Sequence, residues 1–265
     1  MKKRIGIIGC GNMGTAIAHA AADASIHLIC YDIDRKRLSL FEKRYHAAIA
    51  SQGREVAREC DRIVLAVKPN DVNTLLEDIR PELNGSKLLI SVAAGITTAH
   101  IETMVDRRVA VVRVMPNMPA LIGAGICAIC KGRFATAGDL RFARRLFGKL
   151  GEVIEIKERL MNAVTAISGS GPAYFFYLVE IMIKAGVRLG LPRGVATKLA
   201  VQTALGSGRA LKETRESPEA LRLKVTSKGG TTEAAFKKFF KNNLEAILEK
   251  GIMAASERAR ELGKQ

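Results

Sequence analysis

The hydrophobic pattern of the chain changes its period near residue 158. Before that point, short apolar runs typical of buried strands alternate with segments of helical periodicity. The expected strands are 4–8, 26–31, 62–67, 87–92, 109–114, 125–130 and 152–156, and the expected helices are 12–23, 34–45, 53–59, 71–79, 97–104 and 138–149. Such alternation predicts an α/β Rossmann-type doubly wound sheet, mostly parallel, with helices on both faces.

Beyond residue 158 the strand signal disappears and helical periodicity continues. The expected helices are 159–168, 172–189, 193–213, 217–225 and 231–263. No low-complexity linker separates the two halves, and the sequence contains no internal repeat. We therefore predict a dinucleotide-binding Rossmann domain over 1–157 and an all-helical C-terminal domain over 158–265.

One helix of this second half is apolar nearly all round. Phe175–Ile183 carries a single charged residue, Glu180. A helix of this kind has to be buried on most sides. The pattern leaves two partners open, the rest of the helical domain or a second subunit.

A glycine triplet follows the first expected strand at once. Gly9, Gly11 and Gly14 have the G-x-G-x-x-G spacing and open a helix of small residues. In this context the first glycine makes a tight turn, the second admits a pyrophosphate, and the third allows close helix–strand packing. The helix start adds N–H donors for the phosphates. The motif predicts a bound dinucleotide.

The end of the second expected strand bears on which dinucleotide is bound. Asp32 lies eighteen residues after Gly14, where an acidic residue usually accepts hydrogen bonds from the adenosine ribose of NAD. The basic cluster Arg35–Arg37 follows, and it is either a binding site for the extra phosphate of NADP or a solvated helix turn. The balance favours NADH weakly over NADPH.

Composition narrows the class of protein. The chain has 265 residues, 48% of them hydrophobic, and a mean hydropathy of +0.09, enough for a substantial core. No uninterrupted apolar run reaches the ~18 residues of a membrane span, and Gly9–Gly14 interrupts what would be the apolar part of a signal peptide. We expect a cytoplasmic enzyme without a membrane partner.

The formal net charge of +16 is unusual, but its distribution argues against a nucleic-acid partner. The basic residues are dispersed among acidic ones, and aromatic residues for base stacking make up only 5%. A positive surface that attracts an anionic cofactor and substrate explains the charge more simply.

The five cysteines predict no metal site. Cys127 and Cys130 have the spacing of half a zinc site, but no second pair or nearby histidine completes it. Strand alternation also sends these two side chains to opposite faces. Reduced, buried thiols are expected.

Two motifs mark the helical half. Ser168–Tyr174 places two glycines and a proline inside a helical pattern, which predicts either a kink of functional use or a plain turn between helices. Thr226–Thr232, with Gly229-Gly230 before a helix start, has the donors for a small carboxylate. An ordinary capping motif is the alternative.

Together these motifs resemble pyrroline-5-carboxylate reductase over essentially the whole chain. The segments that carry the resemblance are Gly9–Gly14, Ala66–Pro69, Val92–Gly95, Met115–Asn117, Ser168–Tyr174, Gly190–Arg193 and Thr226–Thr232, in this order. The resemblance implies reduction of 1-pyrroline-5-carboxylate to L-proline with NADPH or NADH, the last step of proline biosynthesis. It also implies a helical domain that binds substrate and forms a homodimer or a larger assembly of dimers.

The resemblance also implies roles for individual residues. Cofactor contacts are expected from Gly9, Cys10, Gly11, Asn12, Met13, Gly14, Asp32, Ala66, Val67, Lys68, Pro69, Ala93, Ala94 and Asn117. Substrate contacts are expected from Ser227, Gly230, Thr231 and Thr232, with Thr232 as the catalytic residue that hydrogen-bonds the ring nitrogen. Lys228 and Leu223 depart from the proline and acidic residue common in the family. Asp32 departs from the Asn-Arg pattern of NADPH-preferring relatives.

The expected chemistry suits what the chain lacks. All four histidines fall in the first half without an obvious partner, and Tyr174–Tyr177 stands where related hydroxyacid dehydrogenases carry a helix lysine. A cyclic imine enters already protonated, so positioning does most of the work. The rival hypotheses are a reductase of another imine or keto acid and a non-catalytic nucleotide sensor.

Overall fold

The computed structural model describes residues 4–22 and 26–263, and its contacts divide the chain into two compact units. The first unit comprises residues 1–170 and 255–265, and the second comprises 171–254. The segments 158–170 and 255–265 thus belong to the first unit. The predicted domain boundary at 157/158 differs from this division, and as a boundary of function it stays a prediction.

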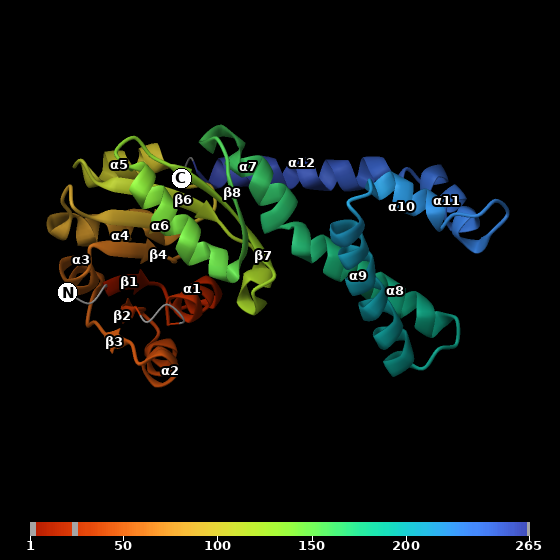
Figure 1. Ribbon diagram of the computed structural model, residues 1–265, viewed down its shortest axis with the longest axis horizontal. Coiled ribbons are helices and arrows are strands. Elements are labelled where there is room, and N and C mark those ends of the chain that lie inside the picture. The colour runs from red at the N-terminus through yellow and green to blue at the C-terminus, as the bar shows by residue number, and fades with distance from the viewer. Residues whose placement is uncertain (1–3, 23–25, 264–265) are drawn as a thin grey trace. The chain divides into compact units, whose positions relative to one another are not determined.

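The first unit is built on one eight-stranded sheet of order β3-β2-β1-β4-β5-β6-β7-β8 (Figure 1). The strands are β1 (Arg4–Ile8), β2 (His27–Tyr31), β3 (Ala48–Ile49), β4 (Arg62–Leu65), β5 (Leu88–Ser91), β6 (Ala110–Met115), β7 (Gly125–Lys131) and β8 (Gly151–Glu155). Neighbouring strands are parallel except β6 and β7. The mostly parallel sheet is confirmed, whereas the two-residue strand β3 was missed.

Helices cover both faces of this sheet, as the alternating pattern predicts. The helices of the first unit are α1 (Asn12–Ala22), α2 (Arg35–Tyr45), α3 (Gly53–Glu59), α4 (Val72–Ile79), α5 (Thr98–Val105), α6 (Ala137–Phe147) and α7 (Met161–Val164). One face carries α1, α2 and α6, and the other carries α3, α4 and α5. Each face buries its own apolar cluster, as expected for a doubly wound sheet. Residue 23, the last of the first expected helix, lies outside the described residues.

The cysteines occupy both of these cores. All five are buried and unpaired by disulfides. Cys127 packs in the cluster under α1 and α6, while Cys130 packs beside Met161 on the other face of β7. The predicted division of this pair between opposite faces is confirmed.

The second unit is helical, with α8 (Gly171–Arg188), α9 (Arg193–Thr214), α10 (Pro218–Lys224), α11 (Thr231–Lys241) and most of α12 (Leu244–Leu262). The prediction of one continuous helix over 231–263 is wrong, because α11 and α12 are separate helices. The helix breaks at Asn242 and Asn243, where Asn243 takes a left-handed φ of 53°, a conformation that asparagine tolerates.

The apolar helix α8 is not buried within this chain. Phe175 is 67% exposed and Leu178 53% exposed. Burial of α8 inside a single helical domain is therefore wrong, and its burial against a second subunit stays a prediction. By length and composition alone, Glu158–Arg188 also passes as a candidate membrane span, which for one helix is weak evidence.

Candidate functional site

The loops that follow β1, β4 and β5 form the candidate cofactor site at the carboxyl edge of the sheet. The strand order reverses between β1 and β4, and ligands of doubly wound sheets bind at such a switch point. Backbone hydrogen bonds join the loops, because Ala66 N–H donates to Ile8 O at 2.7 Å and Val92 N–H donates to Leu65 O at 3.1 Å. The structure thus brings three of the predicted cofactor segments together.

The glycine loop after β1 has the geometry that its spacing predicts. Gly9 has a φ of 101°, and a Cβ there would stand 2.5 Å from Ala66 O. A Cβ on Gly14 would collide with the carbonyl oxygen of Gly9. A Cβ on Gly11, by contrast, would meet only the Arg37 guanidinium, at 3.7 Å. The loop therefore packs against backbone at Gly9 and Gly14 and leaves free space beside Gly11. That space lies at the start of α1, where a pyrophosphate would approach.

Asp32 lies at the end of β2, where the sequence places it, and its side chain is buried. Its two carboxylate oxygens accept hydrogen bonds from the N–H groups of Cys10 at 2.6 Å and Asp34 at 2.8 Å. Arg37 stands 3.7 Å from Asp32 and 3.4 Å from Asp34. Asp32 therefore fixes the glycine loop, and its contact with a ribose stays a prediction.

The remaining first-unit residues lie around the same edge. Lys68 is exposed and precedes a short turn of 3₁₀-helix. The side-chain oxygen of Asn117, just after β6, accepts a hydrogen bond from Ile126 N–H at 2.9 Å. This bond directs the amide oxygen of Asn117 toward the backbone of β7, so any contact with a nicotinamide falls to the NH₂ group of Asn117.

The motif Ser168–Tyr174 folds as a helical irregularity and not as an inter-helix turn. A π-helical turn spans Thr165–Gly169 and is followed by α8 at Gly171. A Cβ on Gly169 would stand 2.5 Å from the methyl group of Met115, at the end of β6. π-turns occur frequently at functional sites, and this one lies beside Met115, the last residue of β6, two residues before Asn117.

The second predicted site, the start of α11, belongs to the second unit. Gly229 has a φ of 73°, and Gly230 is the N-cap residue, with no side-chain cap among the described residues. A Cβ on Gly230 would stand 2.5 Å from Ser227 Oγ and 3.0 Å from Ser227 O, so a side chain there would displace the serine hydroxyl. The motif thus packs Ser227 against the helix start and leaves the first-turn N–H groups of Thr231 and Thr232 directed out of the helix.

Glu233 completes this turn. Its carboxylate accepts a hydrogen bond from Gly229 N–H at 2.9 Å and pairs with Lys237 at 3.1 Å. The Gly229 N–H, and secondarily Lys237, hold the pKa of Glu233 below its ordinary value. The anionic Glu233 side chain thus orders the glycine turn, and the N–H groups of Thr231 and Thr232 remain available to a ligand.

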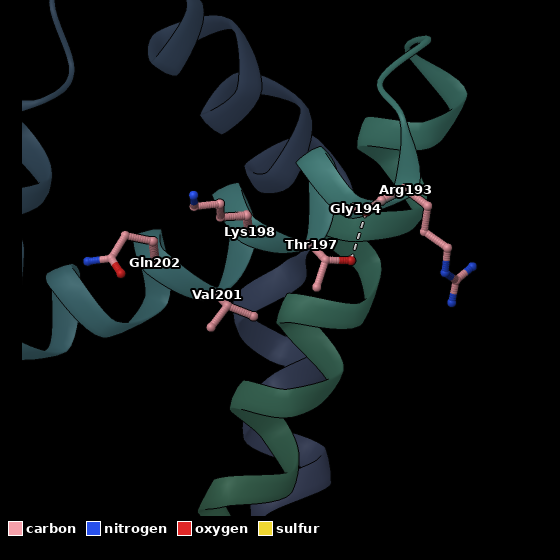
Figure 2. A pocket seen from close by; sticks show the side chains of 6 residues that line it. All are labelled: Arg193, Gly194, Thr197, Lys198, Val201 and Gln202. Carbon is pink, nitrogen blue, oxygen red and sulfur yellow. Dashed lines mark hydrogen bonds between the residues drawn. The ribbon is translucent and has the colours of Figure 1, made fainter.

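An open hollow lies along the first turns of α9. Figure 2 shows Arg193, Lys198 and Gln202 pointing outward along it, with Thr197 turned back to donate to the carbonyl of Arg193 at 2.9 Å. No predicted site residue lines this hollow.

Other expected features also find their places. His19, His27 and His46 are exposed, and His100 shares a hydrogen bond of 2.6 Å with Asn73, so the histidines have the ordinary polar roles predicted for most of them. Sequence reasoning missed Glu158, whose carboxylate binds Thr98 and Arg113. The charged Arg113 inside an apolar strand was the only local signal of this network.

Comparison with known proteins decides the family. A model described as pyrroline-5-carboxylate reductase dimerisation matches residues 158–262, and one described as NADP oxidoreductase, coenzyme F420-dependent, matches residues 4–95. A pyrroline-5-carboxylate reductase from Synechocystis is 37% identical over 269 residues, covering 100% of both chains. The chain belongs to the pyrroline-5-carboxylate reductase family.

Members of this family from distant organisms agree along the full length. The Arabidopsis thaliana reductase is 35% identical and covers 98% of this chain and 96% of its own. The structure of a Plasmodium falciparum pyrroline carboxylate reductase with NADP bound is 35% identical, covers 98% of both chains and superimposes with a TM-score of 0.89. The predicted family and Rossmann-type fold are confirmed.

Proposed function

We propose that this protein reduces 1-pyrroline-5-carboxylate to L-proline with NADH or NADPH, the last step of proline biosynthesis. The observation that carries the proposal is the uncapped start of α11 at Gly230, in a chain that also has the dinucleotide loop Gly9–Gly14. A helix start of this kind binds a small carboxylate through its N–H groups. The relatives are named for this reaction.

The proposed substrate residues bind two different parts of the substrate, its carboxylate and its ring nitrogen. The N–H groups of Thr231 and Thr232, with the hydroxyl of Ser227 beside Gly230, bind the carboxylate of the substrate. The Thr232 hydroxyl hydrogen-bonds the ring nitrogen and fixes the orientation of the ring. Because the imine is protonated, its C=N electron pair moves to nitrogen as the carbon accepts hydride, and no protein acid is needed.

The bound reduced nicotinamide supplies that hydride. Gly9, Cys10, Gly11, Asn12, Met13 and Gly14 would hold the pyrophosphate, with Ala66, Val67, Lys68 and Pro69 along the adjoining strand end. Ala93, Ala94 and Asn117 would lie at the nicotinamide end. Asp32 supports NADH through its negative charge, whereas Arg35–Arg37 would favour NADPH, and we retain the weak preference for NADH.

We also propose that a second copy of the chain covers the apolar face of α8. The dimerisation family model spans this helix, and the exposed side chains of α8 are too apolar to remain in water. This gives a homodimer, from which larger assemblies can form. The cytoplasmic location and the absence of nucleic-acid and membrane partners stay predictions.

The first test is the loss of absorbance of NADH and NADPH, measured separately, with 1-pyrroline-5-carboxylate. Rapid oxidation is expected, and the ratio of the two rates reports the cofactor preference. Thr232→Ala should lower turnover at least about tenfold while cofactor affinity stays unchanged. The exposed Thr103→Ala on α5 is the matched control. Cofactor binding without oxidation of either dinucleotide would refute the reaction, and unchanged turnover in Thr232→Ala would refute the role of Thr232.

A further inference from the structure

The loop between β5 and α5 is held from two sides by segments that lie far away in the sequence. The loop runs from Val92 to Thr97 and contains Ala93 and Ala94, two of the proposed cofactor contacts. Its entry is fixed on the sheet side by the hydrogen bond from Val92 N–H to Leu65 O. Its middle and its exit are fixed by contacts outside the predicted nucleotide-binding domain 1–157.

The first contact is between the backbones of two glycines, Gly95 in the loop and Gly263 after α12. Gly95 has a φ of 82°, and a Cβ there would stand 2.7 Å from Ala259 O and 2.8 Å from Gly263 N. In return, a Cβ on Gly263 would collide with the carbonyl oxygen of Gly95. The C-terminal turn of α12 therefore lies directly on the loop backbone, at a distance that neither position allows with a side chain.

The second contact comes from Glu158. Its carboxylate accepts hydrogen bonds from the N–H of Thr98 at 2.7 Å and from the Thr98 hydroxyl at 2.6 Å. Thr98 is the first residue of α5, so the negative charge also stabilises the start of that helix. The buried Arg113 holds the Glu158 carboxylate in place. It is 2% exposed, and its guanidinium stands 3.4 Å from that carboxylate.

We propose that Glu158 and Gly263 are positioning residues, which hold the β5–α5 loop in the form that receives the nicotinamide cofactor. The inference rests on the proposed function. The two segments flank residues 171–254 in the chain, so the shape of the loop depends on the parts of the first unit through which the second unit is attached. Displacing a positioned group by about 1 Å costs as much as a hundredfold in activity.

Two variants in the full chain test this from opposite sides of the loop. Gly263→Ala forces the C-terminal turn away from Gly95, and Glu158→Ala removes the acceptor for Thr98. Each should raise the Kd for the reduced dinucleotide, measured by nicotinamide fluorescence, about tenfold. The cofactor KM should rise with it, while the KM for 1-pyrroline-5-carboxylate at saturating cofactor stays unchanged. Glu158→Gln keeps one acceptor oxygen and should recover much of the affinity.

The controls separate positioning from general destabilisation. Gly148→Ala places a methyl group in open space, and Glu155→Gln alters an exposed carboxylate. Both should leave the Kd unchanged. Wild-type affinity in folded Gly263→Ala and Glu158→Ala proteins would overturn the proposal, as would equal losses in Glu158→Gln and Glu158→Ala. Failure of the unmodified protein to bind either dinucleotide would instead refute the proposed function. Binding without turnover would refute only the reaction, because the Kd still tests the loop.

Discussion

The two units of this chain bury their apolar residues in different ways. In the first unit, helices on both faces of the sheet enclose two clusters that include Ile7, Leu65 and Phe147, all essentially inaccessible to solvent. In the second unit, α10 and α11 have no buried residue, and α8 has only Gly171. Because exposed apolar area of this extent is unfavourable in water, the proposed second copy of the chain is needed to cover the second unit, whereas the first unit encloses its two clusters within one chain.

The largest expected effect concerns the thiols, all of which lie in the first unit. Burial raises the pKa of Cys60, Cys127 and Cys130 to about 12. Because the thiolate is the reactive form, a disulfide reagent at pH 8 should label these three cysteines about a thousandfold more slowly in the native protein than in the unfolded chain. Diluting the protein until it dissociates should preserve this protection. Labelling that accelerates on dilution would show that the first unit is not complete in one chain.

The next effect breaks the proposed interface of the second unit. Leu178→Asp places a charge on the exposed apolar face of α8 and should weaken self-association by about 3 kcal/mol, more than a hundredfold in Kd. Sedimentation velocity over a range of concentrations measures this shift. The control is Leu40→Asp on α2, because Leu40 is 66% exposed in the first unit. Equal association of the two variants would place the interface elsewhere.

These expectations also show how far sequence reasoning reaches. The strands and their order of appearance follow from apolar runs such as Ile5–Ile8, because a buried parallel strand needs a continuous apolar segment. The glycine loop follows from its spacing, because only glycine fits at Gly9 and Gly14. These features depend on neighbours in the sequence.

Features that depend on distant contacts could not be predicted in this way. Gly263 resembles an ordinary C-terminal glycine until Gly95 is seen against it. Glu158 resembles a surface charge until Thr98 and Arg113 are seen at its carboxylate. The break at Asn243 was missed because helical periodicity continues on both sides of it. The sequence of α8 is as apolar as that of a core helix. Only the elements around it in the structure show that this face is exposed.

A smaller effect is expected at Asp32, within the self-contained first unit. Asp32→Asn replaces an oxygen that accepts from a backbone N–H by an NH₂ group, which leaves one buried donor unpaired and costs about 1–3 kcal/mol. Cofactor affinity should fall about tenfold, with NADH affected more than NADPH. Asp34→Asn is the control, because asparagine caps α2 equally well. Unlike that of Leu178→Asp, this loss should be independent of protein concentration. An unchanged ratio of NADH to NADPH affinity would remove Asp32 from the choice of cofactor.

The smallest effect is expected at Glu233, which orders the glycine turn of the second unit. Because its pKa is lower in the folded chain than the ordinary 4.5, the ionised form stabilises the turn above that pH. The contribution is lost as the pH falls from about 4.5 through the lowered pKa. Glu233→Gln should therefore flatten the pH dependence of melting in this range and change the melting temperature at pH 7 only slightly, because the side chain is exposed. Turnover should fall less than in Thr232→Ala, since the glutamine oxygen still accepts from Gly229 N–H. A Glu233→Gln protein with an unaltered pH profile would mean that the turn is ordered without this carboxylate, by the packing of Ser227 against Gly230 alone.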